Sequence, residues 1–356
     1  MQQTAHPEIA AIGRALPPNY YPSETLSAAL WNKWNGPAEE RARFVRIHRS
    51  AGVGGRHLAL PLDAYRSLDS FGASNAAWIT AATDLGAEAV DTALRRAGLR
   101  PTDVDHLFFT TVTGVASPSV DVKLVNRLGM RADVKRTPMF GLGCVGGAAG
   151  TARAADYVRG FPDHVAVMLS VELCSLTLQL GDRSIANVIS TALFGDGAAA
   201  VVLRGDHVAN GSGPRVIATR SLFFHDTEEI MGWRVTDGGF NVVLTAGIPD
   251  LIRDRLAPAA DAFLAEQGLE RCDVRHWMAH TGGPKVLRAI EDSLELAPDA
   301  LARSWRSLAA IGNLSSASVM FVAADVIESS EPVRGEYGVM LSLGPGFCGE
   351  LVLVRW

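Results

Sequence analysis

The chain has 356 residues, which exceeds what a single hydrophobic core usually organises, so we expect two lobes. Its composition, 48% hydrophobic and 20% charged, is ordinary for a globular protein, and a formal net charge of -5 argues against nucleic acid as the main partner. The four cysteines lie far apart without a C-x-x-C pair, so the pattern indicates neither a zinc site nor a disulfide framework.

The amino-terminal segment, residues 1–23, contains no basic stretch followed by an apolar run, so we expect no secretory signal. No part of the chain approaches the roughly 18 uninterrupted apolar residues of a membrane helix. These observations predict a cytoplasmic protein that binds neither nucleic acid nor membrane. Positive charge is nevertheless concentrated soon after this segment, and such a run is usually a solvated surface. The residues concerned are Arg41, Arg43, Arg46, His48, Arg49 and Arg56.

A segment of the first half recurs in the second half. Residues 89–106 (AVDTALRRAGLRPTDVDH) align without gaps on residues 259–276 (AADAFLAEQGLERCDVRH), with eight identities in eighteen positions. In each copy, apolar positions at helical spacing lead to a glycine suited to a C-cap, and a polar turn then leads into a short apolar run. That run is too short for a helix and predicts a buried strand. A helix followed by a strand in both halves indicates two similar α/β lobes.

The joint between the lobes is predicted from a glycine- and proline-rich stretch. Gly211, Gly213 and Pro214 interrupt the chain after a strand-like run of the first half. We therefore expect an N-terminal lobe over residues 1–210 and a C-terminal lobe over residues 211–356.

The first lobe carries a cysteine among glycines. Residues 140–150 read FGLGCVGGAAG, with four glycines within three positions of Cys144. Such small residues allow backbone, or a group that is not protein, to approach the sulfur. Residues 148–160 predict a helix, which places Cys144 near its N-terminus, where aligned N–H groups favour a thiolate. The alternative is a packed structural cysteine, because free cysteine is commonly buried.

Two polar residues of the second lobe could complete a site with this thiol. His280 follows the second copy of the repeat and precedes Gly282 and Gly283, so a tight turn would expose its imidazole. Asn313 lies within GNLSSAS (312–318), ahead of an apolar stretch. Each has a structural alternative: the histidine as a core residue and the asparagine as a helix cap.

Six motifs in order make the chain resemble the type III polyketide synthases of the chalcone and stilbene synthase superfamily, closer to its bacterial branch. They are TTVTGVASPS, FGLGC, LFGDGAAAVV, AHTGGPK, GNLSSAS and the terminal GPGF, and they extend over nearly the whole chain. The resemblance implies a thiolase-like five-layered αβαβα fold made of two duplicated lobes, and a homodimer. It also implies an acyltransferase that uses acyl-CoA and malonyl-CoA and needs neither a metal nor another cofactor.

The resemblance assigns catalysis to Cys144, His280 and Asn313. Cys144 would carry the acyl starter as a thioester, with its pKa lowered by the imidazolium of His280 and by the helix N-terminus. His280 and Asn313 would donate hydrogen bonds to the enolate that forms when malonyl-CoA loses CO₂. Decarboxylative Claisen condensation would extend the chain before it is cyclised.

The same resemblance implies residues around the cavity. Phe194 matches a gatekeeper between the CoA tunnel and the cavity, although a core aromatic is the alternative. A second gatekeeper position aligns with Val242, with Phe240 two residues before it, so the width of the entrance stays open. Trp233 would shorten one branch of the cavity. The other implied wall residues are Thr113, Cys174, Thr177 and Ser315.

Binding of CoA is implied for the arginine-rich segment, because guanidinium groups suit phosphates. Arg46 is the best match and Arg49 the next, while Lys285 lies near the same tunnel together with Gly282 and Gly283. Ser117 and Pro118 match a loop in which relatives carry a cis bond and reach into the partner subunit.

Two other readings of the sequence remain open. A β-ketoacyl-ACP synthase III has the same three catalytic residue types, but it carries His-Gln-Ala-Asn where this chain has HTGGPK, and it lacks GPGF. The second alternative is a noncatalytic dimeric relative. Four intact residues argue against it: Cys144, His280, Asn313 and Phe194. The product expected from the bacterial branch is an alkylpyrone or a resorcinol-type compound from an aliphatic starter.

Overall fold

The structure is a computed structural model that describes residues 6–34, 36–211, 213–329 and 331–356. Residues 1–5, which belong to the segment expected to lack a secretory signal, lie outside this part. The strands are β1 (Glu8–Ala15), β2 (Asn19–Pro22), β3 (Gly55–Leu58), β4 (His106–Thr111), β5 (Lys135–Phe140), β6 (Val165–Leu173), β7 (Asp196–Arg204), β8 (Arg215–Phe223), β9 (Met231–Thr236), β10 (Gly239–Leu244), β11 (Val274–Ala279), β12 (Tyr337–Gly344) and β13 (Cys348–Arg355).

Ten α-helices connect these strands in the described ranges of the chain. They are α1 (Ser23–Trp34), α2 (Ala38–Ser50), α3 (Phe71–Ala97), α4 (Val120–Leu128), α5 (Gly146–Gly160), α6 (Ile185–Leu193), α7 (Ile248–Ala265), α8 (Pro284–Leu294), α9 (Ala302–Ile311) and α10 (Ser318–Ile327). The helix predicted over 148–160 is confirmed as α5.

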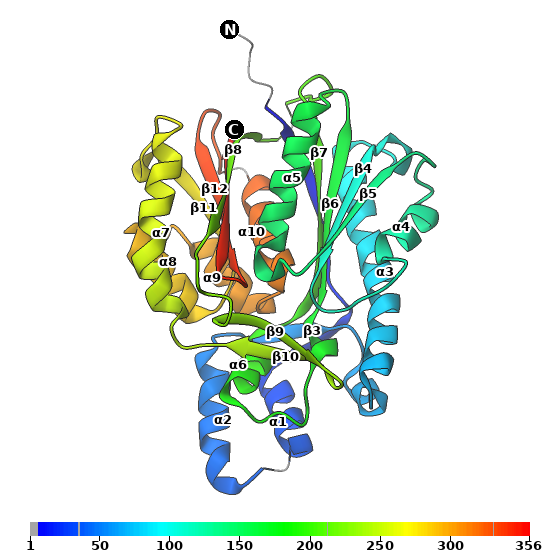
Figure 1. Cartoon of the computed structure of the whole chain (residues 1–356), viewed down its shortest axis with the longest axis vertical. Coiled ribbons are helices and arrows are strands. Elements are labelled where there is room, and N and C mark those ends of the chain that lie inside the picture. The colour runs from blue at the N-terminus through cyan, green and yellow to red at the C-terminus, as the bar shows by residue number, and fades with distance from the viewer. Residues whose placement is uncertain (1–5, 35, 212, 330) are drawn as a thin grey trace.

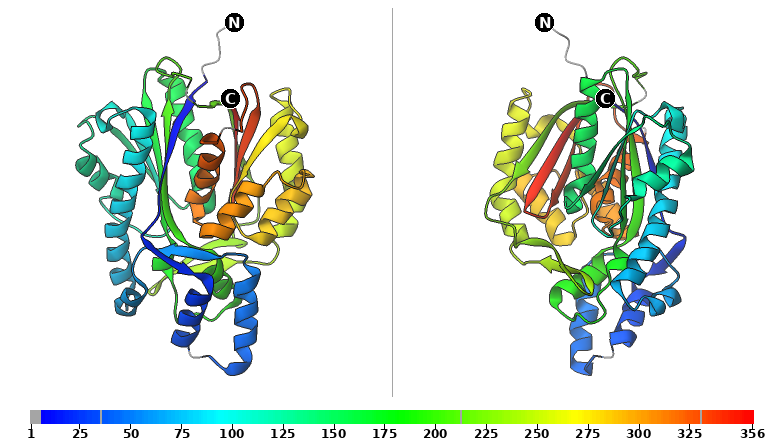
Figure 2. Two further views of the ribbon diagram at one scale, coloured as in Figure 1. Left: turned by 180° about the vertical axis from the view of Figure 1, so that it is seen from behind. Right: turned by 45° about the vertical axis from the view of Figure 1, so that its right-hand side comes forward.

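One large sheet has the strand order β11-β12-β13-β8-β1-β7-β6-β4-β5, and among the described residues a single strand-paired residue pair joins its two halves. β1 pairs with β7 along its length but with β8 only through Glu8 and Arg215. The two halves lie side by side with α5 and α10 between them (Figure 1). Helix α3 covers the outer face of one half, and α7 and α8 cover the outer face of the other (Figure 2). The predicted five-layered αβαβα fold is therefore confirmed.

The repeated segments adopt the same local structure in both halves. Each contains a long helix, a glycine with positive φ, a short 3₁₀-helix and a strand. The shared aspartate explains the turn, because Asp103 and Asp273 each accept a 2.8 Å hydrogen bond from the backbone N–H three residues earlier. The two strands predicted after the glycines are confirmed as β4 and β11.

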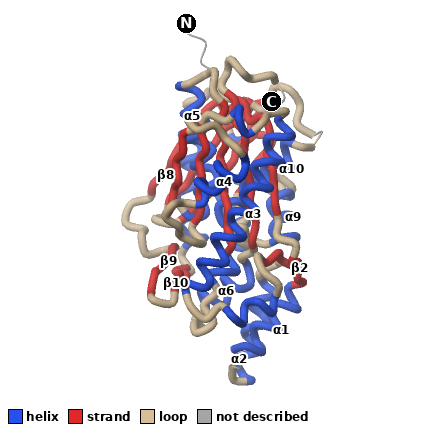
Figure 3. Tube along the Cα trace, turned by 90° about the vertical axis from the view of Figure 1, so that its right-hand side faces the viewer, coloured by secondary structure: helices blue, strands red, loops and turns tan. Residues whose placement is uncertain are grey.

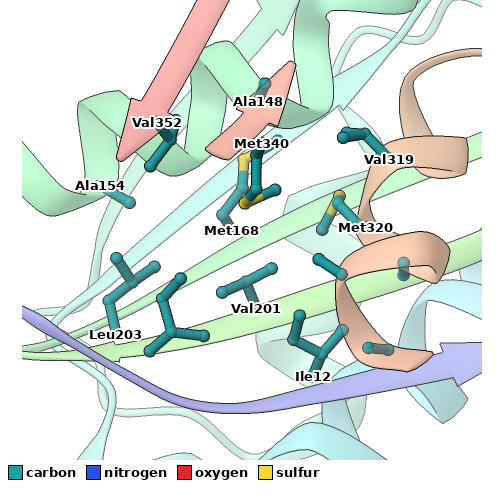
Figure 4. Packing of buried hydrophobic residues seen from close by; sticks show 14 of the residues in the cluster. Ile12, Ala148, Ala154, Met168, Val201, Leu203, Val319, Met320, Met340 and Val352 are labelled. Carbon is teal, nitrogen blue, oxygen red and sulfur yellow. The ribbon is translucent and has the colours of Figure 1, made fainter. Parts of the chain in front are cut away.

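The central helices pack against both halves of the sheet, as Figure 4 shows for part of this buried cluster. Small side chains on α5 make this possible, and a Cβ added at Gly150 would collide with Met168 of β6. Close packing of this kind tolerates little movement. It therefore fixes the position of the N-terminus of α5, next to Cys144. The labelled residues are Ile12, Ala148, Ala154, Met168, Val201, Leu203, Val319, Met320, Met340 and Val352.

A smaller group of elements covers one end of the layered body. Helices α1, α2 and α6 and the β9-β10 hairpin gather at the end of the molecule opposite the carboxyl terminus (Figure 3). The cavity described below lies where this group meets the turns that follow the central strands. Within the described part of the chain, no helix is both long and apolar enough to cross a membrane.

Candidate active site

A cavity of about 660 Å³ brings together side chains from both halves of the fold. Cys144 comes from the turn before α5, His280 from the turn after β11, and Asn313 from the turn after α9. All three residues line this one cavity, although the sequence separates the first from the other two by more than a hundred residues.

The turn that carries Cys144 explains the glycines around it. Cys144 lies in a 3₁₀-turn directly before α5, and its Sγ is 3.6 Å from Oγ of Ser315. Gly143 has a φ of +56°, and a Cβ at this position would collide with Pro345. A Cβ at Gly147 would collide with the carbonyl oxygen of Ser316. The glycines thus let the backbone of the second half pack against the turn, and the group that approaches them is protein.

Backbone hydrogen bonds hold His280 at the end of its strand. Its N–H donates to the carbonyl of Leu341 on β12 at 2.8 Å, and its own carbonyl accepts from Gly282 N–H at 2.9 Å. The side chain is 4% exposed, and its Nδ1 has no hydrogen-bond partner in the described part of the protein. The tight turn predicted from the two following glycines is present, and the imidazole faces the cavity rather than bulk solvent.

Asn313 is fixed through both its backbone and its side chain. Its N–H donates to the carbonyl of Leu193 at 2.8 Å, and its carbonyl accepts from Gly195 N–H at 2.9 Å. Its Oδ1 accepts from Ser315 N–H at 2.8 Å and from Ser318 Oγ at 3.4 Å. These two bonds fix the orientation of the amide, so its donor atom, Nδ2, is left to donate a hydrogen bond in the cavity.

Burial keeps both the thiol and the imidazole neutral. It raises the pKa of Cys144 to about 12 and lowers the pKa of His280 to about 4. The nearby carboxyl of Glu172 raises the pKa of Cys144 further. The expectation that the thiol pKa is lowered is therefore wrong, because loss of water disfavours each isolated charge.

Glu172, which lies behind the wall of the cavity, is a residue that the sequence analysis missed. It is fully buried in β6, and its carboxyl accepts from Val112 N–H at 3.1 Å, from Thr113 Oγ1 at 3.0 Å and from Ser316 Oγ. Burial raises its pKa to about 7, against the effect of these donors. The signal available in the sequence was a lone charged residue, the glutamate, in a largely apolar strand, VAVMLSVEL.

The wall of the cavity contains most of the residues implied by the resemblance. Thr113 is not among the residues that line it, because its hydroxyl is held by the carboxyl of Glu172 and by Leu173 N–H, and Val112 lines the cavity instead. Thr177 lines a neighbouring cavity. The implied residues that do line the cavity are Cys174, Phe194, Trp233, Val242 and Ser315.

Trp233 and Val242 face each other across the β9-β10 hairpin, which closes one side of the cavity. Phe240, which the sequence placed near the second gatekeeper position, is buried behind Trp233, with ring centroids 6.0 Å apart. Phe240 lines the neighbouring cavity. Of Phe240 and Val242, the two candidates for the second gatekeeper, only Val242 borders the cavity of Cys144.

Positive charge surrounds the approach to the cavity. The exposed Arg43 and Arg46 of α2 and the exposed Lys285 line it, and Gly282 and Gly283 lie between Lys285 and His280. Arg49 lies outside the cavity, in a shallow hollow on α2 that includes Arg46.

Two members of the basic cluster predicted near residue 50 are interior residues. His48 is buried, its Nδ1 lies 2.6 Å from Ser27 Oγ, and burial lowers its pKa to about 3. Arg56 is also buried. The alternative of a solvated basic face therefore fails for these two side chains. No group of three or more His, Cys, Asp and Glu residues in the described ranges is arranged to hold a metal ion.

Comparisons with known proteins agree with this geometry. The model of the N-terminal domain of chalcone and stilbene synthases matches residues 2–207, and the model of the C-terminal domain matches residues 216–356. The chain is 53% identical to 1,3,6,8-tetrahydroxynaphthalene synthase of Streptomyces peucetius subsp. caesius, over 98% of this chain and 93% of that protein. It is 30% identical to 3,5-dihydroxyphenylacetyl-CoA synthase of Streptomyces toyocaensis, over 98% of this chain and 90% of that protein.

A crystal structure of 1,3,6,8-tetrahydroxynaphthalene synthase from Streptomyces coelicolor A3(2), a bacterial type III polyketide synthase, superposes with a TM-score of 0.93 at 27% identity. The match covers 98% of this chain and 99% of that one. The two domain models together span nearly the whole sequence. The chain therefore belongs to the chalcone and stilbene synthase family, and it is an acyltransferase of the bacterial type III polyketide synthase branch.

Proposed function

We propose that this enzyme condenses malonyl-CoA units on Cys144 and cyclises the chain to an aromatic polyketide of the tetrahydroxynaphthalene class. The observation that carries the proposal is the meeting of Cys144, His280 and Asn313 in one cavity with arginines at its approach. The proposal keeps the division into lobes 1–210 and 211–356, of which the first supplies the nucleophile and the second its two partners.

Loading begins when Sγ of Cys144 attacks the thioester carbonyl of an acyl-CoA. His280 accepts the thiol proton, the bond between the carbonyl carbon and the CoA sulfur breaks, and CoA leaves as a thiol with the proton from His280. Because thiol and imidazole are both neutral before the reaction, the proton moves as the thioester arrives. The resulting pair of thiolate and imidazolium has no net charge, so burial opposes it less than either ion alone.

Extension uses the decarboxylation of malonyl-CoA in place of a strong base. The bond between the α-carbon and the carboxylate breaks, CO₂ leaves, and the electron pair becomes the enolate of the acetyl thioester. Nδ2 of Asn313 and the Nε2–H of His280 donate to the enolate oxygen. The enolate carbon then attacks the acyl carbonyl on Cys144, and the sulfur leaves as the thiolate. These steps require CoA thioesters as substrates, and no step requires a metal or a redox cofactor.

The product class is proposed from the relative at 53% identity. A naphthalene skeleton with oxygens on alternate carbons is what folding a linear chain of malonyl-derived units would give. In a cavity bordered by Trp233 and Phe194, a small starter leaves more room for the growing chain than a long one does. An alkylpyrone or resorcinol-type product from an aliphatic starter, as expected from the sequence, is the outcome that would replace this assignment.

We also propose that the active form is a homodimer. β5 forms one edge of the large sheet, and Phe140 at its end is 55% exposed. An exposed aromatic at an unpaired strand edge favours association with a second copy. Ser117 and Pro118, which are joined by a cis peptide bond, belong to the loop implied to contact the partner.

The test is incubation of the purified enzyme with labelled malonyl-CoA, with and without an aliphatic acyl-CoA, and identification of the products by mass spectrometry. Malonyl-CoA alone should yield the aromatic product, and Cys144→Ala should reduce it by at least about 10³-fold. Cys272→Ala, which removes an exposed thiol outside the cavity, is the matched control and should retain activity.

Three results would contradict the proposal in different ways. Product from Cys144→Ala would refute the assigned nucleophile. Strict dependence on malonyl-ACP would identify a β-ketoacyl-ACP synthase III activity. The absence of any labelled polyketide from a broad panel of starters would favour a noncatalytic relative.

A further inference from the structure

Arg56 lies inside the protein, at a position that links two motifs of the site. The residue belongs to the short strand β3 and is only 4% exposed. Its Nη1 donates to the carbonyl of Phe194 at 3.1 Å and to the carbonyl of Thr191. Both carbonyls belong to the end of α6, where the chain turns toward the cavity. A buried guanidinium therefore holds the backbone of the gatekeeper residue.

The stem of Arg56 also packs against the turn that carries Asn313. A Cβ added at Gly312 would lie 3.2 Å from Cγ of Arg56, and one added at Gly195 would lie 3.5 Å from its Cβ. Gly312, which has a φ of +79°, directly precedes Asn313, and Gly195 directly follows Phe194. The side chain of Arg56 thus packs against two turns, one at Phe194 and one at Asn313. A β-bridge between Phe194 and Asn313 joins these turns.

Asp196 fixes the segment from which Arg56 projects. Its carboxyl accepts from Ala59 N–H at 2.6 Å and from Ser175 N–H at 2.8 Å. Burial lowers the pKa of Arg56 to about 10, against the attraction of Asp196, so the guanidinium is charged at neutral pH. Asp196 thus fixes the segment that carries Arg56, and Arg56 in turn binds the backbone of the turn at Phe194.

Packing alone does not account for a charged group at this position. Nε of Arg56 has no hydrogen-bond partner among the described residues. Burying a cation with an unpaired donor opposes stability, and an apolar side chain of similar length is often tolerated as well or better. The guanidinium is therefore suited to a task that an apolar side chain could not perform, namely to hold two carbonyls at a set position.

We propose that Arg56 is a positioning residue for chain extension, acting through Phe194 and Asn313. The inference rests on the proposed function, in which Asn313 stabilises the enolate. No hydrogen bond or ion pair of Arg56 involves Cys144 or His280 in the described part of the chain, and the two residues required for loading are held by other contacts. Loss of the guanidinium should therefore impair decarboxylation and condensation while sparing transfer of the starter to Cys144.

The test compares Arg56→Met and Arg56→Lys with Arg204→Met. Arg204 is a matched control, because it is another buried arginine that donates to a backbone carbonyl, that of Ala97, away from the cavity. Loading is followed as the rate of acyl-Cys144 formation by mass spectrometry, and extension as release of CO₂ from malonyl-CoA. Thermal unfolding of each variant reports the stability of the fold.

Arg56→Met should lose about 10²-fold in extension, the scale of a misplacement of about 1 Å, with loading changed by no more than about twofold. Arg56→Lys, which keeps the charge but not the planar fork, should recover part of the extension rate. Arg204→Met should leave the ratio of extension to loading unchanged, whatever its stability.

Two results would overturn the inference: an equal loss of loading and extension in both Arg56 variants, or no loss in either. Arg56→Lys keeps the test decisive if Arg56→Met does not fold. A wild-type enzyme that loads but never extends would count against the proposed function and not against Arg56, so the two failures are distinguishable.

Discussion

Thr110 and His280 occupy equivalent positions just after the two copies of the internal repeat, four residues beyond the shared histidine, yet only His280 borders the cavity. Strand β4 continues through Thr110, whereas β11 ends at Ala279, and His280 begins a turn. Both side chains are buried, and each has a polar atom, Thr110 Oγ1 or His280 Nδ1, without a partner in the described part of the protein.

The difference follows from the neighbours of each strand. β4 lies between β5 and β6 and pairs with both at Thr110, so its backbone continues as a strand at that residue. β11 is an edge strand that pairs with β12 alone, so its backbone is free to turn after Ala279. α5 covers Thr110, since a Cβ at Gly146 would lie 2.9 Å from its Oγ1. The two halves thus share a duplicated scaffold, and the catalytic candidate His280 lies where their structures differ.

The largest expected effect is the loss of the histidine, compared with the loss of its counterpart. His280→Ala should reduce polyketide formation by about 10³-fold, because it removes both the acceptor of the thiol proton and a donor to the enolate. Thr110→Val, which removes a hydroxyl without a partner, should leave activity and thermal unfolding nearly unchanged. Comparable losses in the two variants would mean that the two positions do not differ in function.

Asn313→Ala should give a smaller and more selective loss. Removing the amide should slow malonyl decarboxylation by about 10²-fold, while acyl transfer to Cys144 should continue, because only the enolate requires this donor. Ser318→Ala, which removes the weaker of the two contacts to Asn313 Oδ1, is the control. It should have little effect on decarboxylation, although it should lower thermal stability because Leu314 N–H loses its acceptor. Decarboxylation and acyl-enzyme formation are measured separately, and a proportional loss of both in Asn313→Ala would contradict the role of an enolate donor.

Local patterns in the sequence predicted the elements that carry the site. The glycine after the repeated helix, the short apolar strand after it and the helix that follows Cys144 are all determined within about twenty residues of chain, so spacing and residue type reveal them. The motifs around His280 and Asn313 marked turns, and the structure has turns there. The single residue pair that joins the two halves of the sheet has no local signature and was not predicted.

Residues whose role depends on burial were the ones that the sequence misassigned. The sequence grouped Arg56 and His48 with the exposed arginines of one basic run. In the structure, contacts with a segment more than a hundred residues away bury both side chains. The thiol pKa was misjudged for the same reason, because it depends on how much water the folded chain excludes. Glu172 escaped attention because its donors come from residues 111–113 and from Ser316, two segments that are far from it in the sequence.

The smallest effect on the reaction is expected at Glu172, where the change should appear in stability. Burial raises the pKa of its carboxyl from 4.5 to about 7, so between these pH values the folded protein keeps a proton that the unfolded chain has released. The free energy of unfolding should therefore fall as the pH rises through this window, and the contribution of the neutral carboxyl should be lost above pH 7. Glu172→Gln has no such titration.

The difference in unfolding free energy between the wild type and Glu172→Gln should consequently shift in favour of the variant as the pH rises from about 5 to 7.5. The shift should reach at most about 3 kcal/mol, since one pKa unit corresponds to about 1.4 kcal/mol. Asp196, whose pKa burial raises to about 6, titrates in both proteins and cancels in the difference. Denaturant unfolding of both proteins at a series of pH values measures this difference in unfolding free energy. A pH-independent difference would show that Glu172 is already ionised in the folded enzyme, held as a carboxylate by its donors from Val112, Thr113 and Ser316.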